Sequence, residues 1–390
     1  MTEQRFGLKR DGLRIVCRSW IPETNGKYPA MIISHGFTGN LNDNAALAQR
    51  FCSDGYAAFT FSFCGGSQDS TPADAKSDGA STDMSLRSEV RDLLTVIDHV
   101  RAQDCVDASR ISLLGFSQGG CVSGMAAGLS PVPIEHLIMV YPALCIPDHA
   151  RRGCLGGARY DPANPPAILD CGRTHLGRAF HKEASAMDVY LDLERYQGPV
   201  LIMHGTEDQV VDLSYSVRAQ SAYRHGQSQL LVVRGMGHGT DAGMMDSLYG
   251  SMTAFLSGMR ELFHVRVVIT SVDDSHEGDT LVRTIPFTGW CESPLFCGSI
   301  LPGACDTQRY PKDGTPDIQA VYTLSGLDAD RQACSIHIVN RNVGGIWKPT
   351  VTTDSKALSW INDTDFTAVL EHSATGPTVR FWARADQKTE

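Results

Sequence analysis

The sequence lacks the cysteine and histidine spacings by which metal sites are recognised. It contains twelve cysteines among 390 residues, but no C-x-x-C pair and no Cys/His arrangement of the zinc-binding kind. Several cysteines lie inside apolar strand-like runs, where the thiol behaves as a small hydrophobic group. We therefore expect reduced thiols rather than disulfides, no metal and no cofactor, as in a cytoplasmic protein.

Long apolar runs and an excess of positive charge are also missing. No uninterrupted apolar stretch is long enough to span a bilayer, and the first ten residues contain no apolar segment of signal-peptide length. Asp and Glu number 44 against 34 Lys and Arg, which gives a net charge of -10. This acidic balance gives no reason to expect nucleic acid or an anionic membrane as a partner.

What the first two thirds of the chain does contain is an alternation of apolar strands and amphipathic helices. Because nearly every strand is wholly apolar, we expect an α/β fold with a mostly parallel sheet covered on both faces. The pattern breaks from about 142 to 195, in an irregular stretch with several prolines and glycines, which we interpret as an inserted cap. The apolar runs are 28–35, 57–63, 110–116, 136–141, 198–203 and 230–233.

After residue 262 the pattern changes to short alternating strands separated by turn signals. Such spacing predicts an antiparallel sandwich or barrel. We therefore expect two domains, an α/β domain over 1–262 and an all-β, barrel-like domain over 263–390. Four aromatic residues of the second domain either form a sugar-stacking face or belong to its core and rim: Trp290, Tyr310, Trp347 and Trp360.

One pentapeptide, Gly115-Phe116-Ser117-Gln118-Gly119, stands between an apolar strand and a stretch of small, helix-tolerant residues. Strand, sharp turn with serine at its tip, and helix are the context of a nucleophile elbow. Glycine is needed on both sides because a Cβ in so tight a turn would meet neighbouring backbone. Ser117 is therefore the candidate nucleophile.

A serine hydroxyl needs a base within hydrogen-bond reach, and the base needs an orienting carboxylate. In α/β folds that carry such a nucleophile elbow, the order of these residues along the chain is Ser, then Asp, then His. Asp208 follows the strand at 198–203, with Glu207 as its competitor, and His238 lies between glycines after the strand at 230–233. We predict a triad of Ser117, Asp208 and His238.

The oxyanion of a tetrahedral intermediate needs two preorganised N–H donors. The residue after the nucleophile, Gln118, supplies one by geometry. The loop after an early strand should supply the other, and Phe37 is the expected donor there. His35 begins the same loop, and we interpret it as a structural residue because His238 already occupies the place of the base.

Over about residues 10 to 260 the chain resembles α/β-hydrolases, and specifically the cinnamoyl or feruloyl esterases. The resemblance implies a cap that binds the hydroxycinnamoyl ring, with Asp148 placed to meet its phenolic hydroxyl and Tyr160 and Phe180 as aromatic neighbours. The matching segments are His35-Gly-Phe-Thr-Gly-Asn40, Gly115-Phe-Ser-Gln-Gly-Gly120, His204-Gly-Thr-Glu-Asp-Gln-Val-Val211 and Gly237-His-Gly239.

The region from about 263 to 390 resembles a family of small β-barrel domains of unknown function. This resemblance implies a fold and no activity. The domain either packs beside the cap and narrows the substrate cleft or makes a subunit contact, as in a homo-oligomer. The matching segments are Gly298-Ser-Ile-Leu-Pro-Gly-Ala304, Ala320-Val-Tyr-Thr-Leu324 and Trp360-Ile-Asn-Asp363.

Together these features predict a serine carboxylic-ester hydrolase that acts through an acyl-enzyme. The expected partner is a small ester, and the resemblance implies plant-derived hydroxycinnamate esters. Within the same fold, a short-acyl esterase, a thioesterase or a peptidase is the alternative. A ligand-binding protein on a hydrolase scaffold is the alternative from a different class.

Overall fold

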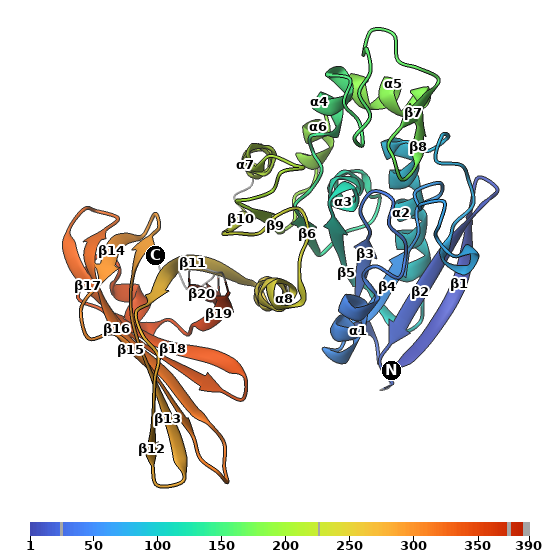
Figure 1. Cartoon of the computed structure of the whole chain (residues 1–390). Coiled ribbons are helices and arrows are strands. Elements are labelled where there is room, and N and C mark those ends of the chain that lie inside the picture. The colour runs from blue at the N-terminus through green and yellow to red at the C-terminus, as the bar shows by residue number, and fades with distance from the viewer. Residues whose placement is uncertain (24–25, 225–226, 373–375, 385–390) are drawn as a thin grey trace. The chain divides into compact units, whose positions relative to one another are not determined.

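The computed structural model describes residues 1–390 except 24–25, 225–226, 373–375 and 385–390. The chain divides into two compact units, Met1–His238 and Gly239–Glu390 (Figure 1). All twelve cysteines are free. Among the helices of the described ranges, none combines the length and the apolar character that crossing a lipid bilayer requires.

The first unit contains an eight-stranded sheet in the order β1-β2-β4-β3-β5-β6-β9-β10. The first two strands are antiparallel, and the other six run parallel to one another. The predicted mostly parallel α/β sheet is therefore confirmed. The strands are β1 (Thr2–Arg10), β2 (Leu13–Ile21), β3 (Tyr28–Ser34), β4 (Ala57–Phe61), β5 (Val106–Phe116), β6 (His136–Val140), β9 (Val200–Gly205) and β10 (Ser228–Val233).

Helices follow most of the parallel strands, as short connections in an α/β sheet require. In α2, Ser85 caps the N-terminus through a capping box with Ser88, and Val90, Leu93 and Ile97 are buried at helical spacing. The helices of this part of the first unit are α1 (Ala45–Ser53), η1 (Ala73–Ala75), α2 (Leu86–Arg101), α3 (Gln118–Leu129) and α7 (Leu213–Ala222).

Between β6 and β9, where the sequence predicts a cap, the chain forms short elements without a long helix. They carry buried apolar residues such as Leu176, Phe180 and Leu193, which join the core of the first unit. The elements are α4 (Ile146–Arg151), β7 (Ile168–Asp170), β8 (His175–Gly177), α5 (Arg178–Ala186) and α6 (Tyr190–Leu193).

The second unit is a closed antiparallel sheet, as predicted. Eight strands form the ring β11-β20-β19-β18-β17-β16-β14-β13, which closes because Val265 pairs with Val379 on one side and with Cys291 on the other. The strands are β11 (Met259–Ile269), β12 (Asp273–Glu277), β13 (Thr280–Glu292), β14 (Phe296–Ile300), β15 (Cys305–Tyr310), β16 (Asp317–Asp328), β17 (Ala333–Val343), β18 (Ile346–Thr353), β19 (Thr367–Glu371) and β20 (Thr378–Arg384).

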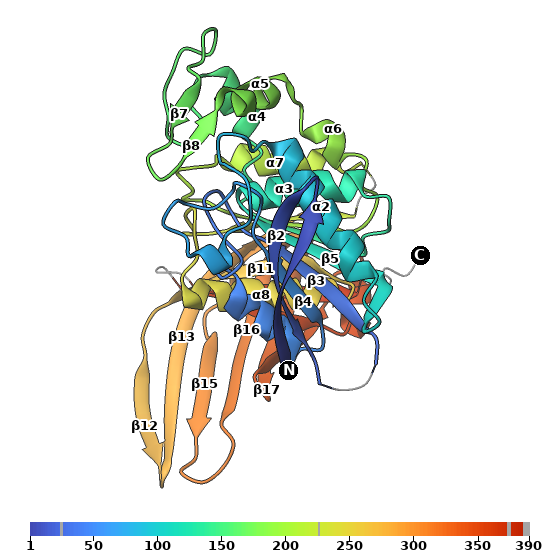
Figure 2. The same ribbon diagram turned by 90° about the vertical axis from the view of Figure 1, so that its right-hand side faces the viewer.

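Two strands outside the ring extend this sheet: β12 pairs with β13, and β15 pairs with both β13 and β16. Figure 2 shows β12, β13 and β15 as a long twisted ribbon. Inside the ring, Phe263 stacks on Phe381 with ring centroids 4.5 Å apart. The remaining short helix of this unit is η2 (Ser359–Asp363).

Helix α8 (Ala242–Leu256) differs from the expectation in its place. The sequence assigns it to the α/β domain, whose end we expect near residue 262, but it belongs to the second compact unit. There the helix passes so close to β19 that a Cβ on Gly250 would lie 3.0 Å from a methyl group of Val369. The exact limits of the two domains stay a prediction.

Candidate active site

Ser117 lies at a sharp turn between β5 and α3. Its backbone has φ 52° and ψ -118°, a conformation that is strained for a residue with a side chain. The turn is as close as the sequence predicts, since a Cβ on Gly115 would lie 2.2 Å from the carbonyl oxygen of Gly119. A Cβ on Gly119 would lie 2.3 Å from the carbonyl oxygen of His35. The turn thus holds the serine hydroxyl clear of both β5 and α3.

The structure brings the three predicted triad residues together. The Ser117 hydroxyl donates a hydrogen bond to Nε2 of His238 over 2.8 Å, and Nδ1 of His238 donates to Oδ2 of Asp208 over 2.8 Å. The Asp208 side chain is fully buried. Glu207, its competitor, is exposed, and its backbone N–H donates to the carbonyl oxygen of Met236.

Asp208 is held by more than the imidazole of His238. Its Oδ1 accepts the backbone N–H groups of Val210 and Val211 over 2.8 and 2.9 Å. These two hydrogen bonds prevent the carboxylate from rotating away from His238. The loop after β9 therefore fixes the orientation of Asp208 before any substrate binds.

His204, at the end of β9, is a contributor that sequence reasoning missed. Its Nε2 lies 3.2 Å from Oδ2 of Asp208 and 2.9 Å from the carbonyl oxygen of Val211, so Nε2 carries the proton. The hydroxyl of Ser216 lies 2.7 Å from its other ring nitrogen. Burial lowers the pKa of His204, which favours the neutral ring. The ring therefore holds Asp208 in place by a hydrogen bond and adds no positive charge beside it.

The donors expected for the oxyanion lie beside the serine. Phe37 and Gln118 line the same cavity as Ser117, and a Cβ on the adjacent Gly36 would lie 3.3 Å from Cβ of Ser117. Gln118 is the first residue of α3, where backbone N–H groups have no acceptor within the helix. Its N–H thus lies at the positive end of the helix dipole, next to Ser117.

His35 is placed as the sequence predicts, in the loop and not at the base's position. It is 2% exposed, its Nδ1 donates to the carbonyl oxygen of Gly36 over 2.7 Å, and its Nε2 accepts the backbone N–H of Phe63. Burial lowers the pKa of His35, which keeps the ring neutral. It ties the loop that carries Phe37 to the segment after β4.

Ser117 opens into an apolar cavity with about 490 Å³ of empty space, part of it open to solvent. The predicted residue Phe180 lines it and is 2% exposed. The side chain of His149 is the polar group of the wall apart from Ser117 and Gln118, and burial lowers its pKa. The lining residues are Phe37, Ser117, Gln118, Ala143, Cys145, Ile146, His149, Leu155, Gly156, Leu176, Phe180, Val210 and Val211.

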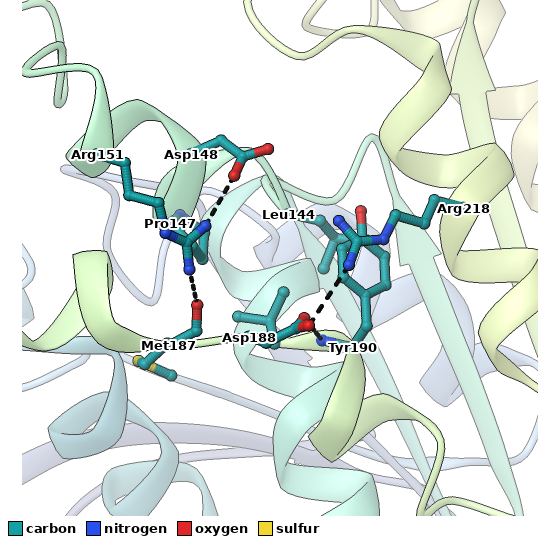
Figure 3. A pocket seen from close by; sticks show the side chains of 9 residues that line it. Leu144, Pro147, Asp148, Arg151, Met187, Asp188, Tyr190 and Arg218 are labelled. Atoms are coloured by element: carbon teal, nitrogen blue, oxygen red, sulfur yellow. Dashed lines mark hydrogen bonds and ion pairs between the residues drawn. The ribbon is translucent and has the colours of Figure 1, made fainter.

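Asp148 lies elsewhere, in a neighbouring pocket of about 270 Å³ (Figure 3). Its carboxylate accepts hydrogen bonds from Arg151 over 2.8 Å and from the hydroxyl of Tyr215 over 3.1 Å. Successive residues of a helix point about 100° apart, so α4 turns His149 into the cavity with Ser117 and Asp148 away from it. Asp148 is not among the described residues that line the cavity with Ser117.

Tyr160 is likewise absent from that described lining. Its hydroxyl lies 2.9 Å from Nδ1 of His181, and burial raises its pKa to about 12. The two rings meet edge to face with centroids 5.3 Å apart. Tyr160 thus packs within the cap.

A buried carboxyl group, Glu89 of α2, lies behind the nucleophile. It is 1% exposed, and its Oε2 accepts a hydrogen bond from the side chain of Gln118 over 2.8 Å. Burial raises the pKa of Glu89 to about 8, partly offset by the hydrogen bond from Gln118. Sequence reasoning had no signal for this pair, because Glu89 lies on an amphipathic helix among ordinary charged positions.

Comparison with known proteins shows which family the first unit is similar to. The model of the family described as Acetyl xylan esterase (AXE1) matches residues 7–241. The structure of Est1E from Butyrivibrio proteoclasticus with ferulic acid bound is 29% identical and superposes with a TM-score of 0.59, covering 65% of this chain and 98% of that one. These matches confirm the predicted resemblance to α/β-hydrolase esterases.

Two further relatives are more distant. The alpha/beta hydrolase GrgF from Penicillium sp. sh18 is 17% identical with a TM-score of 0.55, over 66% of this chain and 98% of that one, and shares the fold. An uncharacterized 31.7 kDa protein of the traX-finO intergenic region of Escherichia coli is 32% identical over 111 residues. That match spans 28% of this chain and only 35% of the relative's length.

Proposed function

The chain belongs, over residues 7–241, to the acetyl xylan esterase (AXE1) family, and from this premise we propose that it is a serine carboxylic-ester hydrolase. The observation that carries the proposal is the pair of 2.8 Å hydrogen bonds that link Ser117 through His238 to Asp208 beside an apolar cavity. A hydroxyl, a base and an orienting carboxylate in this geometry are what nucleophilic acyl transfer requires.

The reaction has two halves. Oγ of Ser117 attacks the ester carbonyl while Nε2 of His238 takes the hydroxyl proton, and the tetrahedral intermediate collapses when the alcohol leaves with that proton. Water then attacks the acyl-enzyme and gives a proton to His238, which passes it to Oγ of Ser117 as the bond to the acyl group breaks and the acid leaves. Asp208 remains ionised throughout, holds the Nδ1–H tautomer and stabilises the imidazolium.

Charge that develops on the substrate oxygen is met by the backbone N–H groups of Phe37 and Gln118. Each such preorganised donor typically contributes about 3 kcal/mol to lowering the barrier. The strained backbone of Ser117 supports the same role, because it places the hydroxyl beside the first turn of α3.

An aromatic acyl group suits the cavity, and we propose hydroxycinnamate esters as substrates. The cavity beside Ser117 is walled mainly by apolar side chains, as sites for aromatic ligands usually are, whereas an acetyl group offers little apolar surface to such a wall. Phe180 and Leu155 offer an apolar wall to the ring. In this proposal His149, rather than Asp148, meets the phenolic hydroxyl.

Acetyl esters of carbohydrates are the second candidate, favoured by the description of the family that matches. The kcat/KM values for methyl ferulate, p-nitrophenyl acetate and acetylated xylan decide between the two. Preference for methyl ferulate supports the first candidate. Hydrolysis of acetylated xylan with none of methyl ferulate supports the second.

A narrowed cavity sharpens this test. Leu155→Trp fills space beside the acyl group, so we expect kcat/KM to fall at least tenfold for methyl ferulate and to change little for p-nitrophenyl acetate. The matched control is Leu191→Trp, at a position of α6 that is 56% exposed. Equal loss on both esters in Leu155→Trp would contradict an acyl site in this cavity.

Labelling tests the nucleophile directly. A serine-directed organophosphonate should add one adduct, mapped by peptide mass to Ser117, in the wild type and in Ser221→Ala, which removes an exposed hydroxyl of α7. Ser117→Ala should remain unlabelled. Labelling of Ser117→Ala at the wild-type rate would remove the basis for serine catalysis.

A further inference from the structure

A second cavity is lined by strands of the closed sheet of the second unit, and part of its space is open to solvent. Residues of β11, β13, β15, β16, β17, β18, β19 and β20 surround it, and an eight-stranded barrel is just wide enough to hold one small ligand. Its wall is apolar apart from a few side chains. The lining residues are Val267, Ile269, Ile285, Phe287, Asp306, Ala320, Tyr322, Asn340, Trp347, Leu370, Pro377 and Val379.

Three polar atoms of this wall are buried and have no hydrogen-bond partner among the described residues. They are Oδ1 of Asp306, the hydroxyl of Tyr322 and Oδ1 of Asn340. The Tyr322 and Asn340 side chains are 4% and 2% exposed. Buried polar groups are normally paired because an unpaired one destabilises the fold. Three such groups in one cavity indicate a site prepared for a molecule that pairs them.

The strand register places these groups in a defined pattern. Asp306 of β15 pairs with Ala320 of β16, which in turn pairs with Asn340 of β17. Because neighbouring strands lie about 4.8 Å apart, the two oxygen acceptors flank the small methyl group of Ala320, where space remains for a ligand. Tyr322 lies two residues further along β16, on the same face of the strand.

Aromatic rings border the same space. The ring of Phe287 meets that of Tyr322 edge to face, with centroids 5.3 Å apart. Trp347 lines the cavity and packs only partly buried against the core of the barrel. Oδ2 of Asp306 already accepts a hydrogen bond from Gln308 over 3.0 Å, so only Oδ1 is left for a ligand.

We propose that this cavity binds a small uncharged ring alcohol or phenol. Ligand hydroxyl groups donate to Asp306 and Asn340, a ligand oxygen accepts from Tyr322, and the ring lies against Trp347. A free sugar fits less well, because three polar atoms in an apolar wall cannot pair all of its hydroxyl groups. This site is separate from the proposed esterase chemistry and does not depend on it.

Calorimetric titration of the full-length protein tests the proposal, with vanillyl alcohol, cyclohexanol and glucose as probes. Ser117 is first labelled with an aromatic phosphonate, so that its cavity is filled. We expect saturable one-to-one binding of vanillyl alcohol or cyclohexanol, and none of glucose. No saturation by either ring alcohol, or binding of glucose alone, would overturn the proposal.

Variants locate the binding. Ala320→Leu projects into the cavity and should raise the Kd at least tenfold, whereas Thr323→Val, on the opposite face of β16, should leave it unchanged. If Ala320→Leu fails to fold, Asn340→Leu serves instead, because it removes an unpaired atom with little change of shape. Equal Kd values in the cavity variant and in Thr323→Val would place the probe elsewhere and refute the site.

Unfolding measurements separate a ligand site from a structural one. Without ligand, Asn340→Leu and Tyr322→Phe should unfold at the wild-type temperature or above it, since each removes an unpaired buried group, while their Kd rises. A lower Tm with an unchanged Kd would mean that the groups are paired within the fold, and the proposal would fail.

Discussion

Each unit contains a cavity that has a mainly apolar wall and is partly open to solvent, yet the polar groups of the two cavities are arranged in opposite ways. In the first unit the polar groups around the nucleophile are joined by short hydrogen bonds: Ser117 to His238, and His238 to Asp208. In the barrel, Asp306, Tyr322 and Asn340 each present an atom without a partner among the described residues.

The difference follows from what each cavity is proposed to do. Catalysis needs groups that are already oriented, because reorganisation during the reaction raises the barrier. Reversible binding needs groups whose hydrogen bonds form only when the ligand arrives, since affinity comes from what is left unpaired beforehand. Paired polar groups thus indicate chemistry here, and unpaired ones indicate recognition.

The largest expected effect concerns the hydrogen-bonded triad of the first unit. Ser117→Ala removes the nucleophile, and kcat for the best ester should fall by about 10⁶-fold, as for loss of the serine in a protease triad. Steady-state hydrolysis measures this, with Ser221→Ala as the control. The barrel's Kd for its ring alcohol should not change in Ser117→Ala, and a parallel loss of binding would mean that the two cavities are not independent.

Next in size is the orienting carboxylate. Asp208→Asn should lower kcat about 10⁴-fold, because an amide cannot stabilise the imidazolium of His238 and favours the wrong tautomer. The neighbouring Glu207→Gln, at an exposed position, should stay within about twofold of the wild type. The opposite ranking of these two variants would identify Glu207 as the acid.

The barrel also contains buried groups that are paired, and these test the comparison within one unit. Arg380, 3% exposed, bonds to Glu371 over 2.7 Å and to Glu261 over 2.9 Å. Arg380→Met breaks both buried ion pairs by removing their shared guanidinium and should lower the free energy of unfolding by about 3–5 kcal/mol. Thermal unfolding checks this against Arg309→Met, whose exposed pair with Glu277 should leave the transition unchanged.

The last effect concerns Glu89 and appears only as a pH dependence of stability. Its folded pKa of about 8 lies above the ordinary value of 4.5. Between these values the folded protein keeps a proton that the unfolded chain has lost, so stability is full below about pH 4.5 and falls as the pH rises to 8. Glu89→Gln cannot ionise and should flatten this fall.

Thermal midpoints measured from pH 5 to pH 8 test the role of Glu89. A difference of about 2–4 °C is expected for each kcal/mol involved. Asp54→Asn, at an exposed position, should follow the wild-type curve. A Glu89→Gln curve that falls as steeply as the wild type would show that another group releases the proton.

Local pattern was enough for part of this site. Ser117, Asp208 and His238 each follow an apolar strand, and parallel strands deliver the loops at their carboxyl ends to one edge of the sheet. The cap could not be predicted in this way, because its elements are too short to show a hydrophobic period that identifies their buried face. Asp148 and His149 are adjacent in sequence, and only the rotation of α4 decides that His149 lines the cavity with Ser117.

The sequence by itself determined the two fold classes, since strand and helix periods and turn residues act over a few neighbours in the chain. The tertiary structure decided which side chains meet: His204 beside Asp208, Glu89 behind Gln118, and three unpaired polar groups within the barrel. Such meetings depend on strand register and on helix rotation. Both are set by the packing of whole elements, in which residues far apart in sequence take part.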